Sequence, residues 1–146
     1  MRALFIGKVF PETASTAAGR RSMDVMQSLQ AAGWELHFAC CAQPSSHAVD
    51  LGAHGISVHS IRVNDAAFDP WFKALQPELV LFDRFMIEEQ FGWRVAQQCP
   101  QALRVIDTSD LHCLRAARAQ ALKTGSAFCP QHPMALREIA AIYRSD

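Results

Sequence analysis

Polar residues between positions 107 and 112 are the strongest candidates for chemistry in this sequence. The carboxylates of Asp107 and Asp110 stand close to the imidazole of His112. Carboxylates accept hydrogen bonds from sugar hydroxyls, and histidine donates or accepts them or carries a proton near neutral pH. The same segment also suits a helix start, with Thr108 or Ser109 as the cap and Asp110 at the positive end. Asp107 and His112 could ligate a metal, but no third ligand has a suitable spacing, so we expect no metal site.

The segment before the first expected helix is a second candidate, for anion binding. It contains Gly19, Arg20 and Arg21. Free backbone N–H groups at a helix start, a glycine that permits close approach and two cationic side chains suit a phosphate. The alternative is a solvated loop in which Ser15 or Thr16 caps the helix. Neither G-x-G-x-x-G nor G-x-x-x-x-G-K-[ST] occurs, which disfavours NAD-type and P-loop functions.

The third candidate is the pair Asp83 and Arg84, which follows the most hydrophobic run in the chain. Asp83 either caps a helix and forms a surface ion pair with Arg84, or the two residues face a ligand cleft. Other histidines are scattered, and we interpret them as surface or incidental residues: His37, His54, His59 and His132. The cysteines are odd in number and lack C-x-x-C spacing, so we expect reduced and mostly buried thiols at Cys40, Cys41, Cys99, Cys113 and Cys129.

Alternating strands and helices must position these candidates. Apolar runs predict strands at 3–7, 34–40, 56–61, 79–82 and 103–106. Helical spacing and end signals predict helices from about 22 to Gly33, 65 to 75, 83 to 98, 111 to Gly125 and 136 to 143, with a short helix before Gly52. The order predicts a single α/β domain with an open, doubly wound, Rossmann-like, mostly parallel sheet and helices on both faces. We expect 79–82 in the centre and 56–61 near an edge. Ligands bind such sheets at the carboxyl ends of the strands, where the three candidate segments begin.

The composition is that of a folded protein without a polyanionic partner. Half of the 146 residues are hydrophobic, and 14 basic side chains balance 14 acidic ones. These values exclude intrinsic disorder and predict no nucleic-acid partner. No apolar run approaches the roughly 18 to 20 residues that span a bilayer. Because the first residues also lack a signal-peptide pattern, we expect a cytoplasmic protein.

Three segments together resemble a known family. They are the run FIGKVFPETASTAAGRRSMDVMQSLQAAGWELHF at 5–38, the segment 76–80 and the segment 104–115, whose D-T-x-D-L-H-x-L-R string is the most specific. They are similar to the N-terminal domain of bacterial glycosyltransferases of the GT-B fold, in the retaining, family-4-like group one. In that fold two Rossmann-like domains face each other across a cleft. The N-terminal one mainly binds the acceptor, and the C-terminal one holds the nucleotide-sugar donor.

The resemblance implies a hexosyltransferase-type enzyme that moves a sugar from a nucleotide-sugar to an acceptor hydroxyl. Residues 1–146 would be its N-terminal, acceptor-side domain. The nucleotide-sugar is a substrate, and no metal or other cofactor is implied. The donor-binding domain of the family and its E-x-x-x-x-x-x-E pattern are absent from these residues, so we expect the isolated chain to be inactive.

The candidate segments and the resemblance together assign roles to individual residues. Asp107 and His112 are the expected catalytic residues. The expected substrate-binding residues are Ala18, Gly19, Arg20, Asp83, Arg84 and Asp110. The resemblance implies that the first loop approaches the donor phosphates at Ala18 and Gly19, and that Asp110 lies on the acceptor side.

Two other functions are consistent with the same residues. One is a stand-alone, flavodoxin-like module that binds a small molecule or a protein. The other is an interaction partner that self-associates through an exposed apolar face, formed by Phe85, Phe91 and Trp93 or by the last helix. The expected partners under the leading hypothesis are a nucleotide-sugar and its acceptor, through which the protein would associate peripherally with a membrane.

Overall fold

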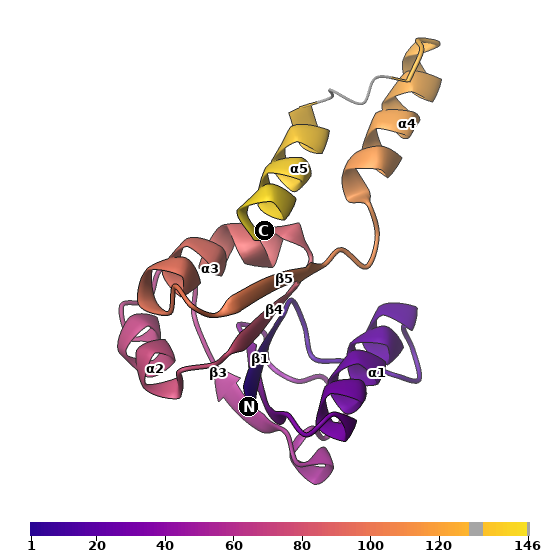
Figure 1. Cartoon of the computed structure of the whole chain (residues 1–146). Helices are drawn as coiled ribbons and strands as arrows, with labels where there is room; N and C mark the ends of the chain where they lie inside the picture. Colours follow the sequence, from indigo (N-terminus) through magenta and orange to yellow (C-terminus); the bar gives the residue numbers. More distant parts are fainter. Residues whose placement is uncertain (129–132, 146) are drawn as a thin grey trace.

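Five parallel strands form the centre of the protein in a computed structural model, which describes residues 1–128 and 133–145 (Figure 1). The strands are β1 Arg2–Gly7, β2 Glu35–Cys40, β3 Ser57–Ser60, β4 Leu79–Asp83 and β5 Leu103–Asp107. They lie in the order β3-β2-β1-β4-β5. The connections after β1 and β4 therefore lead to opposite halves of the sheet, and the gap between these two strands is the topological switch point where ligands bind in open α/β sheets.

The strand order confirms an α/β, Rossmann-like sheet and corrects two details of the prediction. The central strand is β1, with β4 beside it, while β3 is an edge strand as expected. In a flavodoxin-like sheet the third strand would lie next to the first, on the side away from the second. Here β3 pairs with β2 instead, so the flavodoxin-like architecture is wrong.

Helices cover both faces of the sheet (Figure 1). Helix α1, Ala17–Ala31, packs Met23 and Met26 against Phe5 on one face. Helices α2, Phe68–Leu75, and α3, Phe85–Gln98, cover the other face, and a short 3-10 helix, η1, spans Gly52–His54 after the expected position. The α1 face is incompletely covered, because Leu103 and Val105 of β5 are 62% and 36% exposed beside the buried α1-face residues of β4.

Helices α4, His112–Thr124, and α5, Pro133–Ser145, form an arm that leaves the sheet (Figure 1). The foot of the arm is held by two acidic side chains. Glu88 of α3 is buried and accepts two hydrogen bonds from Arg144 Nε and one from its NH2. Glu138 of α5 is 1% exposed and accepts a hydrogen bond of 2.6 Å from the backbone N–H of Cys113. Glu138 therefore caps the amino end of α4 from the neighbouring helix.

Several local predictions are confirmed and others are wrong. Gly33 and Gly125 end α1 and α4 with positive φ, as expected of C-terminal glycines. Asp83 is the last residue of β4 and does not cap α3, and neither Thr108 nor Ser109 caps α4. Each of these helices instead begins without a side-chain cap from the residue before it.

The burial of individual residues also departs from the predictions. Phe91 is fully buried and cannot contribute to an exposed face, whereas Trp93 is exposed. His37 is buried against His59, so its interpretation as an incidental surface residue is wrong. The thiols of Cys40, Cys41, Cys99 and Cys113 are free, and only Cys40 and Cys99 are buried. Cys129 and His132 lie outside the described residues.

No helix within the described part of the chain combines the length and the apolar character needed to cross a membrane. The arm nevertheless exposes apolar side chains, with Leu122 at 85% and Tyr143 at 74% exposure. The arm thus consists of two helices, α4 and α5, that leave several apolar side chains uncovered.

The Glu138 cap predicts that the arm depends on one buried carboxylate. We expect Glu138→Ala to lower the free energy of unfolding in urea by about 1–3 kcal/mol, because the Cys113 N–H is left without its acceptor. Hydrogen exchange at the Cys113 amide should also become faster. Leu136→Ala, at an exposed position of α5, is the control and should have a small effect. Equal losses in the two variants would show that Glu138 does not hold the arm.

Candidate functional site

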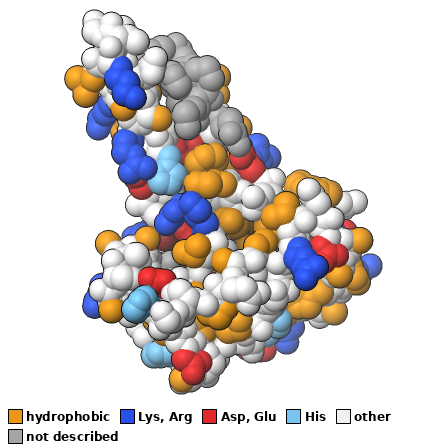
Figure 2. All heavy atoms as spheres, turned by 180° about the vertical axis from the view of Figure 1, so that it is seen from behind, with side chains coloured by type: hydrophobic (Ala, Val, Ile, Leu, Met, Phe, Trp, Pro, Cys, Tyr) orange, Lys and Arg blue, Asp and Glu red, His pale blue; other side chains and the backbone are white. Residues whose placement is uncertain are grey.

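A cavity of about 420 Å³ lies where the arm meets the body of the protein. On the face shown in Figure 2, basic and histidine side chains gather at this junction. The cavity, called the arginine pocket below, is lined by Ala17, Ala18, Arg21, Arg84, Ser109, Asp110, His112 and Arg115. Its walls come from the start of α1, the end of β4 and the β5–α4 connection, so the pocket lies at the switch point of the sheet.

The first turn of α1 supplies backbone donors to the arginine pocket. Thr16 caps the helix by accepting the N–H of Gly19 at 2.9 Å, which confirms one of the two expected caps. The preceding N–H groups of Ala17 and Ala18 have no acceptor within the helix. The first turn also holds no acidic side chain. The positive end of the α1 dipole therefore faces the pocket without a local countercharge.

Gly19 supports this helix start by packing and does not line the pocket. A Cβ at position 19 would lie 2.6 Å from the carbonyl oxygen of Glu12 and closer still to the Glu12 nitrogen. The carbonyl of Glu12 also accepts the backbone N–H of Thr16 at 3.0 Å. Gly19 thus allows the backbone of the preceding loop, at Glu12, to pack closely against the helix, and it does not serve the approach of a ligand.

An ion pair fixes Arg21 on the wall of the pocket. Arg21 Nε donates to Oδ1 and Oδ2 of Asp107 at 3.0 and 2.9 Å. Asp107 is 8% exposed and also accepts the N–H of Ser109. The ion pair uses the Nε of Arg21, so its terminal nitrogens, which have no hydrogen-bond partner among the described residues, remain able to donate. Asp107 thus does not line the pocket itself but positions Arg21 on its wall.

Arg84 adopts an unusual backbone conformation at the end of β4. Its φ and ψ are 73° and 160°, in a region where almost only glycine is found and which costs other residues about 1–3 kcal/mol. The backbone N–H of Arg84 donates to the Asp107 carbonyl at 2.8 Å, which holds this conformation. Arg84 Nε is buried, lies 3.5 Å from Asp83 Oδ1, and has no hydrogen-bond partner in the described residues. A cationic donor at the switch point is therefore left unsatisfied.

The buried side chain of Asp83 connects the end of β4 to the loop after β1. Its Oδ2 accepts the backbone N–H of Lys8 at 3.0 Å, and this bond joins the ends of β4 and β1 across the switch point. Asp83 is paired in register with Asp107 of β5. The two buried carboxylates thus stand side by side under the arginine pocket.

Asp110, His112 and Arg115 form a coupled cluster on the arm side of the pocket. Asp110 Oδ2 lies 2.6 Å from Arg115 NH1 and 3.2 Å from His112 Nδ1. Arg115 NH2 also lies 3.0 Å from His112 Nδ1. A neutral His112 can donate from Nδ1 to Asp110 or accept there from Arg115, but it cannot do both. A ligand that binds Arg115 would therefore favour the tautomer that leaves Nε2 of His112 unprotonated.

The structure brings together half of the residues predicted for the site. Ala18, Arg84, Asp110 and His112 line the arginine pocket. Gly19, Asp83 and Asp107 lie behind its walls as described above. Arg20 does not line this cavity. It lines a neighbouring surface groove on the sheet side of α1, beside Leu81, and this groove shares Ala17 and Arg21 with the arginine pocket.

Two further lining residues are Arg21 and Arg115. Arg21 is, with Arg20, a cationic residue of the predicted anion-binding segment but is not among the expected substrate-binding residues, and no role is predicted for Arg115. Helical spacing is the signal that could have identified both. Arg21 follows Ala18 by three residues, and Arg115 follows His112 by three, so each lies one turn along the same helix face. Arg20 is turned away by the same geometry.

The lining suits a phosphorylated anion. Three guanidinium groups, from Arg21, Arg84 and Arg115, converge with the amino end of α1. Guanidinium groups bind phosphate oxygens through paired charged hydrogen bonds, and helix starts add backbone donors. Among the described residues, no group of three or more His, Cys, Asp or Glu side chains is placed to hold a metal ion.

Comparison of the chain with models of known protein families and with curated proteins finds no match. The fold and the site define it as an α/β protein with a Rossmann-like parallel sheet and a cationic pocket at the switch point.

The packing of Gly19 predicts that its substitution by alanine destabilises the protein, although alanine favours a helix. Gly→Ala within a helix ordinarily stabilises by up to about 1 kcal/mol. We expect Gly19→Ala to destabilise by about 1–3 kcal/mol in urea unfolding, because its Cβ would overlap the Glu12 backbone. Gln27→Ala, at an exposed position of the same helix, should be neutral or slightly stabilising. A stabilising Gly19→Ala would contradict the close packing of the loop.

The strain at Arg84 predicts that glycine is the more stable residue there. We expect Arg84→Gly to unfold with a free energy about 1–3 kcal/mol above that of Arg84→Ala, since both variants lack the guanidinium but only glycine adopts this φ freely. Urea denaturation of the two variants and the wild type gives this difference. Equal stabilities of the glycine and alanine variants would refute the strained conformation.

Proposed function

We propose that this chain is the acceptor-side domain of a glycosyltransferase, and that the arginine pocket binds the diphosphate of a nucleotide-sugar. The convergence of Arg21, Arg84 and Arg115 at the switch point carries the proposal. A diphosphate has enough oxygens to engage several guanidinium groups at once, and it would supply the acceptor that Arg84 Nε lacks. A volume of about 420 Å³ accommodates a diphosphate together with part of a sugar.

The most specific string of the family resemblance supports this assignment. The string D-T-x-D-L-H-x-L-R covers 107–115. Ser109, Asp110, His112 and Arg115 from this string line the pocket, and Asp107 holds Arg21 on its opposite wall. Residues that suggest the family from sequence are thus residues that build the cavity.

The pocket residues fit the electron and proton movements of sugar transfer. In the proposed reaction the acceptor oxygen bonds to the anomeric carbon, and the bond from that carbon to the leaving phosphate oxygen breaks. The diphosphate receives the electron pair, and Arg84 and Arg115 would stabilise its added charge. The hydroxyl proton would pass to Nε2 of His112, whose Nδ1 is held by Asp110.

A protein-binding module remains the second candidate because of the arm. Its exposed Leu122 and Tyr143 are suited to a protein partner rather than to a small ligand. This function does not require the arginine pocket to bind a nucleotide-sugar, so the two candidates separate in one binding experiment.

Binding of UDP-glucose to the 146-residue chain tests the proposed function by isothermal titration calorimetry. We expect saturable binding that weakens at high salt, because the contacts are between charges. Arg84→Gly and Arg115→Ala should each weaken binding at least tenfold. Arg118→Ala, three residues from Arg115 on α4 and outside the pocket, is the matched control and should bind as the wild type does.

The outcomes of this titration are distinct. No saturable binding, or equal weakening by Arg118→Ala, would overturn the assignment of the pocket. If inorganic pyrophosphate binds as tightly as UDP-glucose, the pocket is an anion site, but its assignment to a nucleotide-sugar is overturned. The chain alone is expected to release no UDP in the presence of sugar acceptors, and measurable release would show that one domain is sufficient.

A further inference from the structure

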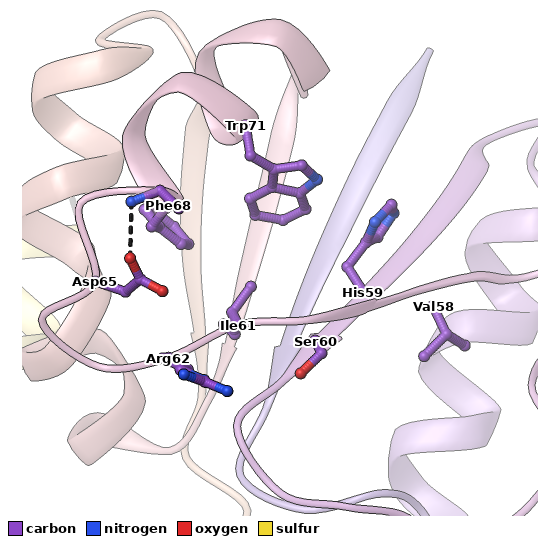
Figure 3. A pocket seen from close by; sticks show the side chains of 9 residues that line it. Val58, His59, Ser60, Ile61, Arg62, Asp65, Phe68 and Trp71 are labelled. Atoms are coloured by element: carbon purple, nitrogen blue, oxygen red, sulfur yellow. Dashed lines mark hydrogen bonds between the residues drawn. The ribbon is translucent and has the colours of Figure 1, made fainter.

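A second cavity, of about 410 Å³, lies at the opposite edge of the sheet from the arm (Figure 3). It is called the β3 pocket below because it wraps around the end of β3 and the start of α2. Its lining includes His59, Ile61, Arg62, Asp65, Phe68 and Trp71. None of these residues lines the arginine pocket, so the two cavities are separate.

A row of hydrogen bonds leads from the start of β2 to His59 on the edge strand β3. Glu35 Oε1 lies 3.0 Å from His37 Nε2, and His37 Nδ1 lies 2.9 Å from His59 Nε2. The parallel register of β2 and β3 places both imidazoles on the sheet face that α2 covers. The histidines are distant in sequence and meet only through this strand pairing.

The row fixes which nitrogen of each neutral ring carries the proton. The Glu35 carboxylate can only accept, so Nε2 of His37 donates and Nδ1 of a neutral His37 must accept. Nε2 of His59 is then the donor to His37, which leaves Nδ1 of His59 with a lone pair. That nitrogen has no hydrogen-bond partner in the described residues.

The surroundings of His59 favour its neutral form. Its burial, together with the neighbouring His37, lowers the pKa of His59 from the ordinary value of 6.5. The ring therefore presents a neutral acceptor to the β3 pocket.

The other lining residues combine an aromatic face with charged groups that bind hydroxyls. Figure 3 shows the rings of Trp71 and His59 turned toward each other across the space above Ile61, and their centroids are 5.0 Å apart. Arg62 and Asp65 lie on the connection between β3 and α2. Asp65 Oδ1 accepts the N–H of Ala67, and Asp65 Oδ2 has no hydrogen-bond partner among the described residues.

We infer that the β3 pocket binds a neutral, polyhydroxylated ring such as a monosaccharide unit. The apolar side of such a ring can lie on the Trp71 indole, which offers a flat apolar surface. Its hydroxyls would donate to His59 Nδ1 and to Asp65 and accept from Arg62. The row through His37 to Glu35 holds the His59 acceptor in place. This site is independent of the function proposed for the arginine pocket.

The tautomers of the two histidines can be measured directly. In long-range ¹H–¹⁵N NMR spectra at neutral pH, we expect the nitrogen signals of an unprotonated Nδ1 and a protonated Nε2 for both His37 and His59. A protonated Nδ1 on His59 would overturn the inferred acceptor and with it the ligand assignment.

Ligand binding is tested on the full 146-residue chain by saturation-transfer NMR. The probes are the methyl glycosides of glucose, mannose and galactose, with adenosine and uridine as comparison ligands. We expect saturation transfer to at least one glycoside, and at least tenfold weaker binding to Arg62→Ala and to His59→Gln. His54→Asn, at an exposed histidine outside the pocket, is the matched control and should bind as the wild type does.

The variants keep the result interpretable. Arg62 is exposed, so its alanine variant should fold even if the substitution at His59 disturbs the packing on Trp71. Transfer to no glycoside, or transfer that is unchanged in Arg62→Ala, would overturn the inference. Binding of a nucleoside without any glycoside would overturn the ligand class. Binding that persists in Arg84→Gly is expected and separates this site from the arginine pocket.

Discussion

Two buried carboxylates, Asp83 and Asp107, organise the carboxyl edge of the sheet. They end adjacent strands, and a charge removed from water is tolerated only where it is paired or hydrogen-bonded. Asp83 draws the loop after β1 to the end of β4 through Lys8, and Asp107 draws α1 and the β5–α4 connection together through Arg21 and Ser109. Three residues that line the arginine pocket, Arg21, Arg84 and Ser109, are among the groups that lie against these two charges.

The strands and most helices could be predicted because their signals are local. Continuous apolar runs mark strands that are buried on both faces, and Gly33 and Gly125 mark helix ends. Contacts between residues that are distant in sequence have no local signal and could not be predicted. Glu138 caps a helix from 25 residues away, and the His37–His59 pair exists only because two strands adopt one register.

The candidate site was predictable in position but not in geometry. Strand order places the loops after β1, β4 and β5 at one edge, so most of the chosen segments meet there. Which arginine faces the cavity depends on helix phase, and this separates Arg21 from Arg20. The positive φ of Arg84 contradicts residue preference altogether, and such strained conformations cluster at functional sites. The position of His112 and Arg115 also depends on the arm. Glu138 joins their helix, α4, to α5, and Arg144 joins α5 to α3.

The position of β1 in the middle of the sheet has a consequence for synthesis on the ribosome. β1 is made before both of its partners, and it pairs with β2 on one side and with β4 on the other. Its second partner is complete only after residue 83 has been added. Until then one edge of β1, whose residues 3–7 are buried in the folded protein, stays open, and long-range pairing of this kind forms slowly. The nascent chain therefore carries an unpaired apolar strand edge until β4 has been made, and such an edge is prone to aggregation before the sheet is complete.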